Sequence, residues 1–480
     1  MNSPVHELQD SIAKSPLQTS YNLQRQSYLD SPEPPFQQRK DNLTNLKSLL
    51  SENKDAIIEA INQDYGNRSW HESVFAEFIA VFDSIDFIAK NLKKWMKPQK
   101  RHVDFKMFPG STNMLTPQPL GVVGIIVPWN FPINLSFIPI ATALAAGNRA
   151  IVKMSENSIN LSKLLTQISP KYFPAETLTF LIETGGVGVE FSSTPFDLIL
   201  FTGSVSTGKA VMASAAKNLT PVILELGGKS PAIIDPQYPL DKAVERIMYA
   251  KQMNAGQICL NVDYVFVHKD QVGEFTQKAK AWVKQHVPDI NSKDYTSVID
   301  DRSVSRLEAT LQDATDNGAT LVNLNDQEIN HQDKKFPLHL VLDSTANMHI
   351  RQDETFGPVL LVMTYEDPQE IMDYVNAHNR PLGLYVFSEN KALTKRYISH
   401  IMSGGVSVNE TLLHAFQDDM PFGGVGHSGM GHYHGQEGFN SFSKMRPVFY
   451  QAKYNAMGLL LPPYNDSLTK AYNFLLKLKS

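Results

Sequence analysis

The residue with the greatest potential for chemistry in this chain is its single cysteine. Cys259 closes the segment 254–259, Asn-Ala-Gly-Gln-Ile-Cys, which we expect between a helix and a strand. A glycine there lets the backbone approach a ligand closely, and a thiolate can attack a carbonyl carbon to form a covalent intermediate. A lone cysteine is more often a buried structural thiol, so the neighbouring motifs have to decide between the two readings.

Two further side chains could serve such a nucleophile. Glu225 ends an apolar segment and is followed by Leu-Gly-Gly-Lys at 226–229. A carboxylate is costly to bury without a partner, so Glu225 is either an ion-paired structural residue or a general base. Asn130 lies in Pro-Trp-Asn-Phe-Pro at 128–132. Its amide could donate a hydrogen bond to a developing oxyanion, although Asn beside prolines is usually a turn residue.

Three segments have features of a dinucleotide site. Segment 201–208, Phe-Thr-Gly-Ser-Val-Ser-Thr-Gly, is typical of a strand, a glycine turn and a helix start. Backbone N–H groups at a helix start can bind a pyrophosphate, but this glycine spacing departs from G-x-G-x-x-G and is weak evidence alone. Lys153 and Glu156 follow another strand, where a carboxylate could bind ribose hydroxyls; a solvated charge pair is the commoner case. Glu354 precedes a strand and could equally be an exposed turn residue.

The elements that must position these residues alternate between strands and helices. Short β-branched apolar segments, typical of buried parallel strands, occur at 122–127, 150–152, 178–182, 198–201 and 222–224. Intervening helices of about 10–15 residues predict βαβ units and a parallel, doubly wound sheet. Such sheets bind ligands beyond the carboxyl ends of their strands. The candidate residues at these ends are Asn130, Lys153, Gly203 and Glu225.

A second α/β region begins near Pro231. Its predicted helices and strands are 240–253, 264–267, 304–317, 338–342, 359–362, 384–387 and 406–408. Ahead of the first sheet, apolar residues at helical spacing predict helices over 36–61 and 71–97. Residues 1–35 are polar and contain Pro-Glu-Pro-Pro, which indicates a partly ordered arm that has room for a short helix.

The composition excludes several classes of protein. The 480 residues carry a net charge of −5, which gives no electrostatic reason to expect nucleic acid or an anionic membrane as partner. One cysteine cannot form an intramolecular disulfide, which fits a reducing compartment. The N-terminus has no secretory signal pattern, and no segment approaches the ~20 apolar residues of a membrane helix. We therefore expect a cytoplasmic protein without stable membrane insertion.

The chain resembles the aldehyde dehydrogenase superfamily over roughly residues 36 to 465, because seven motifs follow one another along it in the same order: 128–132, Lys153 with Glu156, 201–204, 225–229, 256–259, 354–358 and 421–424. Chance agreement of seven ordered motifs is negligible, so the structural reading of Cys259 is set aside. The finer match is to the class 3 branch, especially coniferyl aldehyde dehydrogenase-like proteins. The segments that carry this finer match are 421–426, 428–431, 433–435 and 460–464.

The resemblance implies a role for each candidate. Cys259 would be the nucleophile, Glu225 the base that activates water, and Asn130 an oxyanion donor. The residues that would bind NAD are Trp129, Lys153, Glu156, Gly203, Ser204, Gly208, Leu226, Glu354 and Phe356. Phe131, His414 and Phe416 would line a substrate tunnel for aryl or medium-chain aldehydes, and no metal is implied. A carboxylate at the adenosine ribose favours NAD. NADP stays open for two reasons: class 3 relatives often accept both cofactors, and Met154 stands where many relatives have proline.

The same resemblance divides the chain into parts. Residues 36–98 and 118–226 would form a Rossmann-like cofactor domain, and 227–420 a catalytic α/β domain. Residues 99–117 and 421–480 would form bridging and oligomerisation segments of a homodimer, with 1–35 as the arm. Two rival functions are a CoA-acylating or phosphorylating aldehyde dehydrogenase and a non-catalytic, lens-type relative. Glu225 argues against the first, and the joint presence of Cys259, Glu225 and Asn130 argues against the second.

Overall fold

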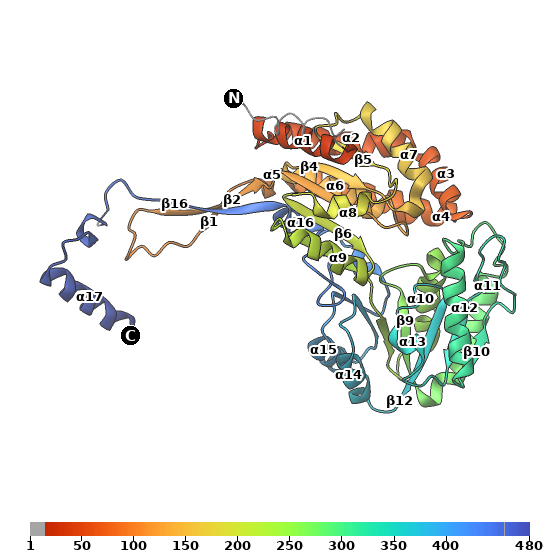
Figure 1. Ribbon diagram of the computed structural model, residues 1–480. Coiled ribbons are helices and arrows are strands. Elements are labelled where there is room, and N and C mark those ends of the chain that lie inside the picture. Colours follow the sequence, from red (N-terminus) through yellow and green to blue (C-terminus); the bar gives the residue numbers. More distant parts are fainter. Residues whose placement is uncertain (1–14, 456) are drawn as a thin grey trace, which may run out of the picture.

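The computed structural model describes residues 15–455 and 457–480, which form two helix-covered sheets and a long antiparallel ribbon (Figure 1). The first sheet has the order β15-β7-β6-β3-β4-β5. Its strands are β3 (Val122–Ile126), β4 (Arg149–Lys153), β5 (Leu178–Leu181), β6 (Leu198–Gly203), β7 (Val222–Leu226) and β15 (Gly429–Met430). All run parallel except β15, which is antiparallel to β7. The predicted doubly wound sheet is therefore confirmed.

Helices lie on both sides of this sheet (Figure 1), because its strands are apolar on both faces. They are α2 (Phe36–Glu52), α3 (Lys54–Tyr65), α6 (Asn134–Ala146), α7 (Ile159–Ile168), α8 (Val187–Ser193), α9 (Val205–Ala216) and α16 (Gly435–Ser441). Helix α6 is buried almost throughout and ends at Gly147, whose φ of 93° is the left-handed conformation that glycine adopts without strain.

The N-terminal segment is better ordered than the predicted arm. Residues Pro16–Asp30 form a fifteen-residue helix, α1, that packs against β3, β4 and β5. Gln24 of this helix is buried, and its side-chain amide donates to the carbonyls of Ala150 and Ala175 at 3.0 Å each. Arg25 pairs with Asp197 at 3.1 Å. The arm prediction is thus corrected from Pro16 onward, because polar side chains on this helix satisfy groups at the sheet; residues 1–14 lie outside the described chain.

The second sheet has seven strands in the order β10-β11-β12-β9-β8-β13-β14. They are β8 (Ser230–Ile234), β9 (Val262–His268), β10 (Thr320–Asn323), β11 (His339–Leu342), β12 (Val359–Tyr365), β13 (Gly383–Phe387) and β14 (Gly405–Val408). Only β10 is antiparallel to its neighbour. The helices of this region are α10 (Leu240–Gln252), α11 (Val272–His286), α12 (Asp301–Asp316), α13 (His349–Gln352), α14 (Pro368–Ala377) and α15 (Lys391–His400).

The predicted helix over 71–97 is interrupted in the structure. It consists of α4 (Trp70–Ser73), a π-helical segment (Val74–Ile79) and α5 (Ala80–Trp95). A π-helical turn within an α-helix is rare and frequently occurs at a functional site. Residues of this segment line a cavity described below.

The ribbon joins segments far apart in sequence. Strands β1 (Gln99–Arg101), β2 (Thr112–Pro119) and β16 (Ser443–Tyr450) form one antiparallel sheet that projects from the body and leads to helix α17 (Asp466–Lys479) (Figure 1). Within residues 15–455 and 457–480, no helix has both the length and the apolar character to span a bilayer.

Candidate active site

The loop that carries Cys259 has an unusual backbone. After α10 the chain makes a short turn in which Asn254, Ala255 and Gly256 have φ of 51°, 50° and 72°. Left-handed conformations cost non-glycine residues free energy, and a Cβ on Gly256 would collide with the Gly357 carbonyl. This turn places Cys259 just ahead of β9, as the sequence predicted.

The thiol of Cys259 lies at the wall of a cavity of about 280 Å³. Burial raises its pKa to about 12, and the nearby carboxylates Glu354 and Glu225 add to this effect. The resting thiol is therefore protonated at neutral pH. It becomes a nucleophile only when a positive group or a base shifts this balance.

Glu225 is the most exceptional carboxylate of the site. Both its oxygens are buried and have no hydrogen-bond partner among the described residues. Burial accordingly raises its pKa well above the usual value. Because an ion-paired structural glutamate would have a partner, this environment favours the reading as a base that meets a bound water or substrate.

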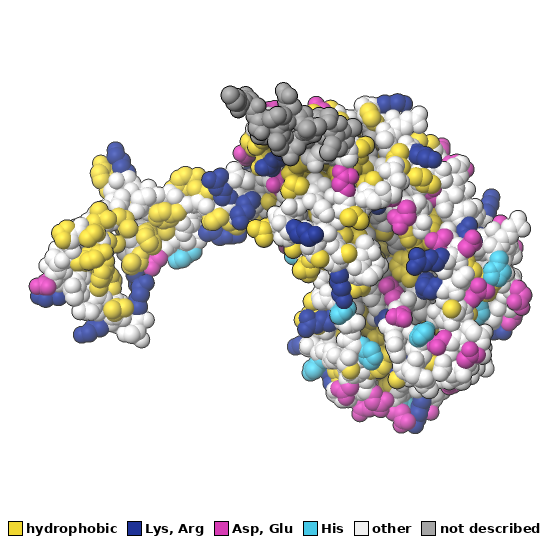
Figure 2. Space-filling model, viewed as in Figure 1, with side chains coloured by type: hydrophobic (Ala, Val, Ile, Leu, Met, Phe, Trp, Pro, Cys, Tyr) yellow, Lys and Arg dark blue, Asp and Glu magenta, His cyan; other side chains and the backbone are white. Residues whose placement is uncertain are grey.

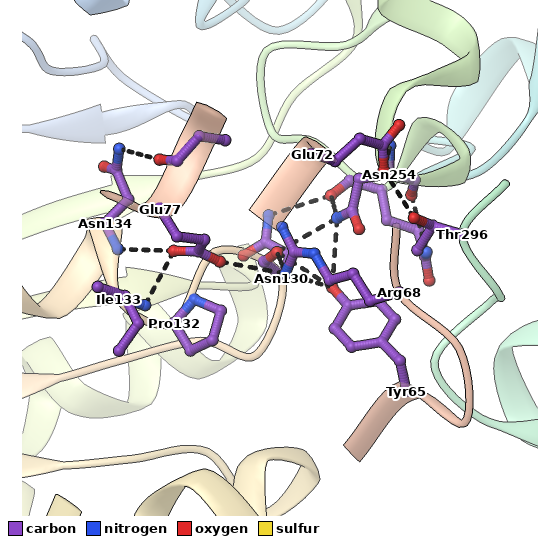
Figure 3. Close-up of polar contacts among 12 residues, drawn as sticks. Tyr65, Arg68, Glu72, Glu77, Asn130, Pro132, Ile133, Asn134, Asn254 and Thr296 are labelled. Carbon is purple, nitrogen blue, oxygen red and sulfur yellow. Dashed lines mark hydrogen bonds and ion pairs between the residues drawn. The ribbon is translucent and has the colours of Figure 1, made fainter. Parts of the chain in front are cut away.

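Asn130 is held by a buried network shown in Figure 3. Its carbonyl accepts hydrogen bonds from Arg68 at 2.8 Å, from the Tyr65 hydroxyl at 3.0 Å and from the Asn254 amide at 3.2 Å. Its own side-chain amide donates to the carbonyl of Gln257 at 3.2 Å. Asn130 is thus fixed next to the turn that precedes Cys259, and its amide has a second N–H to offer.

Two acids, the buried Glu77 and the partly buried Glu72, complete this network. Glu77 pairs with Arg68 at 3.1 Å, both side chains being fully buried, and accepts from the amides of Ile133 and Asn134 at 3.0 and 2.8 Å. Glu72 accepts hydrogen bonds from the backbone N–H of Asn254 at 3.0 Å and from the Thr296 hydroxyl at 2.6 Å. Burial raises the pKa of both acids. The network therefore links the π-helical segment to Asn130 and to the turn before Cys259.

We predict that Arg68→Met lowers the free energy of unfolding by about 3–5 kcal/mol, because Glu77 is left as an unpaired buried charge. Chemical denaturation measures this loss. The double variant Arg68→Met, Glu77→Gln should recover most of the stability but not the turnover, since the backbone carbonyl of Asn130 still lacks the shortest of its three hydrogen bonds, the one from Arg68. Full recovery of turnover in the double variant would show that Arg68 has no part in positioning Asn130.

Several of the predicted cofactor residues lie at the carboxyl ends of strands in the first sheet. The register pairs Ile126 with Lys153 and Gly203 with Leu226, so the ends of β3, β4, β6 and β7 align. Ser204 caps α9, its hydroxyl accepting from the Thr207 amide at 3.3 Å. A Cβ at Gly208 would strike Leu226, so this glycine lets α9 approach β7. The arrangement leaves a helix start free to face an anion.

Lys153 and Glu156 do not form a pair. Lys153 is buried and its Nζ lies 2.9 Å from Glu183, whereas Glu156 is exposed on the following turn. Glu183 also accepts from the backbone amides of Gly185, Val187 and Gly188. Partial burial opposes ionisation, but Lys153 and these amides hold the pKa of Glu183 below its usual value. A second carboxylate, absent from the sequence interpretation, therefore stands beside the ribose candidates.

Glu354 lies against the glycine pair that follows Glu225. A Cβ at Gly227 would overlap its carboxylate, and burial raises the pKa of Glu354 to about 8. Lys229 ties down the preceding loop by donating to the carbonyls of Ile350 and Asp353 at 2.8 Å each. The rings of Trp129 and Phe356 meet edge to face at 5.6 Å.

The cavity at Cys259 has a mainly apolar wall. Phe131 and Phe416 line it, together with residues of the π-helical segment and of α6. His414 is not among its lining residues in the described chain. Its ring is held by the Ser407 hydroxyl at 2.9 Å and packs near Tyr385. The assignment of His414 to the tunnel is corrected accordingly.

Comparison with known proteins gives this geometry a context. The model of the aldehyde dehydrogenase family matches residues 26–448. The chain belongs to the aldehyde dehydrogenase family. The predicted family, fold and enzyme class are thereby confirmed: this is an NAD(P)-dependent aldehyde dehydrogenase.

Among the relatives of this aldehyde dehydrogenase are two bacterial proteins named for one substrate. A probable coniferyl aldehyde dehydrogenase of Pseudomonas aeruginosa is 45% identical over 455 residues, covering 95% of each chain. The coniferyl aldehyde dehydrogenase of Pseudomonas sp. strain HR199 is 36% identical over 97% of each chain. The substrate-bound structure of Staphylococcus aureus AldH is similar with a TM-score of 0.90 at 30% identity, covering 96% of this chain and 100% of that one.

The NAD+ complex of Staphylococcus aureus betaine aldehyde dehydrogenase is also similar, with a TM-score of 0.81 at 25% identity, covering 92% of this chain and 88% of that one.

Sequence reasoning missed part of the site of this aldehyde dehydrogenase. Arg68, Glu77 and Glu183 are distant in sequence from every motif. A signal was present for Glu77, a carboxylate between Ala76 and Phe78 on what is otherwise a core-facing helix side. Lys251 is likewise buried without a partner among the described residues, and burial lowers its pKa to about 8.

Proposed function

We propose that this protein oxidises an aryl aldehyde such as coniferyl aldehyde, or a medium- to long-chain aliphatic aldehyde, to its acid with NAD+ and water. The observation that supports this most is the position of Cys259 on an apolar cavity, with the buried Glu225 nearby, which has no hydrogen-bond partner in the part of the chain that the structure describes. A binding protein would have no need of such a costly carboxylate. In this proposal the six-stranded sheet belongs to the cofactor domain (36–98, 118–226) and the seven-stranded sheet to the catalytic domain (227–420).

The chemistry proceeds in two halves. The Cys259 thiolate attacks the aldehyde carbon, and the Asn130 amide with the Cys259 backbone N–H stabilises the oxyanion of the thiohemiacetal. NAD+ held by the residues named below would supply the hydride acceptor, so that loss of a hydride from the thiohemiacetal would leave a thioester on Cys259. Glu225 then takes a proton from water, the water oxygen bonds to the acyl carbon, and the carbon–sulfur bond breaks. One aldehyde, one water and one NAD+ yield acid, NADH and a proton.

The residues at the sheet edge fit a dinucleotide. Thr202 has a buried hydroxyl without a partner among the described residues, and a cavity of about 240 Å³ is lined by Val205, Gly227 and Glu354, among others. Gly203, Ser204 and the start of α9 would receive the pyrophosphate. Glu354, Phe356 and Trp129 would hold the nicotinamide side, beside Leu226 and the α9 face at Gly208.

Lys153 and Glu156 would hold the adenosine ribose, and they favour NAD over NADP. Glu183 holds the Lys153 ammonium at 2.9 Å, and Glu156 is exposed nearby. The 2′-phosphate of NADP would therefore lie near two carboxylates, while the ammonium of Lys153 is already paired with one of them. We propose the cytoplasm as the location, because a chain with a single cysteine has no intramolecular disulfide and suits a reducing compartment.

The test is formation of NADH or NADPH at 340 nm by the purified protein, without CoA or phosphate. The aldehyde panel holds coniferyl aldehyde, benzaldehyde, hexanal and decanal. Turnover with NAD+ supports the proposal, and a higher kcat/KM with NADP+ would contradict the cofactor preference. Activity that appears only after CoA or phosphate is added would show that this compound, and not water, is the acyl acceptor.

We also propose a homodimer built on the ribbon. Hydrophobic side chains gather over α17 and the segment before it (Figure 2). Those exposed there include Leu461, Tyr464, Tyr472, Phe474 and Leu476. Patches of this kind mark protein interfaces, and a two-fold axis would cover both copies with one surface.

We expect light scattering to give about twice the chain mass of 53.7 kDa, because the α17 patch is buried between copies. Phe474→Asp with Leu476→Asp should reduce it to the monomer. Lys470→Asp, a charge change on the same helix, is the control. A monomeric wild type, or a dimer that persists in the double variant, would contradict this role of α17.

A further inference from the structure

The cavity that leads to Cys259 is polar at one end. Its opening is rimmed by Phe75, Ile79 and Leu413, which are all exposed. Asp83 of α5, also exposed, lies at the same opening. Cys259 lines the same cavity, together with the buried Tyr433. A substrate with its aldehyde at Cys259 therefore extends through an apolar passage toward Asp83.

Two further acceptor and donor groups lie in the cavity wall near Asp83. The Ser84 hydroxyl donates to one carboxylate oxygen of Asp418, in a short hydrogen bond. The other oxygen of Asp418 has lone pairs to offer. Burial raises the pKa of Asp418, the Ser84 hydrogen bond opposes this, and Asp83 adds to it. The charged groups facing Asp418 thus make this end of the cavity acceptor-rich.

His434 lines the same cavity and is unsatisfied. Only 8% of it is exposed, and neither ring nitrogen has a partner among the described residues. Its ring stacks on Phe422 at 5.5 Å, and its φ of 77° shows that the fold holds it there at a cost. Burial lowers its pKa to about 4, so at neutral pH it offers one N–H donor and one acceptor.

His434 and Asp418 line the same cavity. Their chain segments approach each other, since a Cβ on Gly435, the residue after His434, would lie 3.1 Å from the backbone carbonyl oxygen of Asp418. The two side chains come from segments on either side of Phe422, and both contribute to the cavity wall. An unpaired donor and a carboxylate acceptor are therefore available to one ligand, which would recover hydrogen bonds that burial otherwise forfeits.

We propose that Asp418 and His434 are specificity-determining residues that recognise a ring hydroxyl on the far side of an aryl aldehyde. The hydroxyl donates to Asp418, and His434 donates to the hydroxyl oxygen or to an ether oxygen beside it. The carboxylates of Asp83 and Asp418 disfavour aldehydes that carry a carboxylate of their own. This inference rests on the proposed function and narrows it to uncharged, ring-hydroxylated aryl aldehydes.

The test compares substrates that differ only in these groups. 4-Hydroxy-3-methoxycinnamaldehyde is set against 3,4-dimethoxycinnamaldehyde, which lacks the donor, and benzaldehyde against 4-carboxybenzaldehyde. Hexanal reports the basal activity. We expect the wild type to prefer the hydroxylated aldehyde by about tenfold in kcat/KM, the value of one hydrogen bond to a charged group. It should oxidise 4-carboxybenzaldehyde poorly.

Two variants then locate the preference. Asp418→Asn keeps an oxygen for Ser84 and should remove most of the hydroxyl preference while raising kcat/KM for 4-carboxybenzaldehyde. His434→Phe keeps the ring stacked on Phe422 and should lower kcat/KM for the hydroxylated aldehyde alone by about tenfold. Asp419→Asn, at the exposed neighbouring carboxylate, is the matched control and should change nothing.

The outcomes separate the two proposals. Oxidation of hexanal and benzaldehyde by a wild type that shows no hydroxyl preference would overturn this inference and leave the proposed function standing. No oxidation of any member of the panel would overturn the proposed function, and this inference with it. Equal losses for both cinnamaldehydes in the variants would assign the two residues a structural role. The wild-type comparison decides the matter even when a variant does not fold.

Discussion

Cys259→Ala is expected to reduce turnover by about 10⁴-fold or more, because removal of a covalent nucleophile leaves only binding and the oxyanion donors. The alanine methyl fits the site without a new polar group, so the fold should be kept. The measurement is NADH formation with the best aldehyde of the panel, with thermal unfolding and NAD+ binding as controls for folding.

The raised pKa of Cys259 adds a second readout to this prediction. At neutral pH the thiol is almost wholly protonated, so alkylation by iodoacetamide should be slow and should accelerate as pH rises toward 12. A positive nicotinamide ring favours the thiolate, so NAD+ should speed alkylation at pH 7. Full turnover in Cys259→Ala would end the covalent mechanism, whatever the alkylation rates.

Glu225→Gln should lower kcat by on the order of 10²–10⁴-fold, the usual range for a lost general base. The thioester should still form, because Cys259 and Asn130 are intact. Mass spectrometry of the enzyme mixed with aldehyde and NAD+ should then detect the acyl group on the peptide that contains Cys259. Unchanged turnover without a trapped species would remove Glu225 from the role of base.

The pH profile follows from the burial of Glu225. Its pKa is raised well above 4.5, and only the ionised form can accept a proton from water. The kcat of the wild type should therefore fall as pH drops through this raised pKa, at a higher pH than an ordinary glutamate would give. In Glu225→Gln this limb should disappear. A limb that survives would point to another titrating group, such as Glu354 with a pKa of about 8.

The sequence predicts the first sheet well because its strands are short β-branched segments buried on both faces. It fails for β8, where Pro231 argues against a central strand. The structure accommodates this proline at a register shift between Ser230 and Pro231. The sequence also gives too little indication of helix α1, because that helix is stabilised by distant carbonyls and by Asp197 rather than by an apolar stripe.

The candidate site divides in the same way. Residues inside local motifs, such as Asn130, Glu225 and Cys259, could be predicted as site residues, because a side chain of such a type at a strand end or in a loop indicates a chemical role. Arg68 and Glu183 could not, because each acts on a group more than twenty residues away and only the packed fold brings them together. His414 was misplaced for a related reason: a loop residue's direction depends on partners such as Ser407.

The π-helical segment Val74–Ile79 has a consequence for how such enzymes diverge. A π-turn corresponds to one extra residue inserted into an α-helix, and this one carries Phe75 and Ile79 on the cavity while Glu77 pairs with Arg68. Deletion of a single residue here would rotate α5, with Asp83 and Ser84, by about 100° relative to α4. Codon gain or loss at this one point could thus exchange a whole cavity wall between lineages while the loop of Cys259 and both sheets stay unaltered.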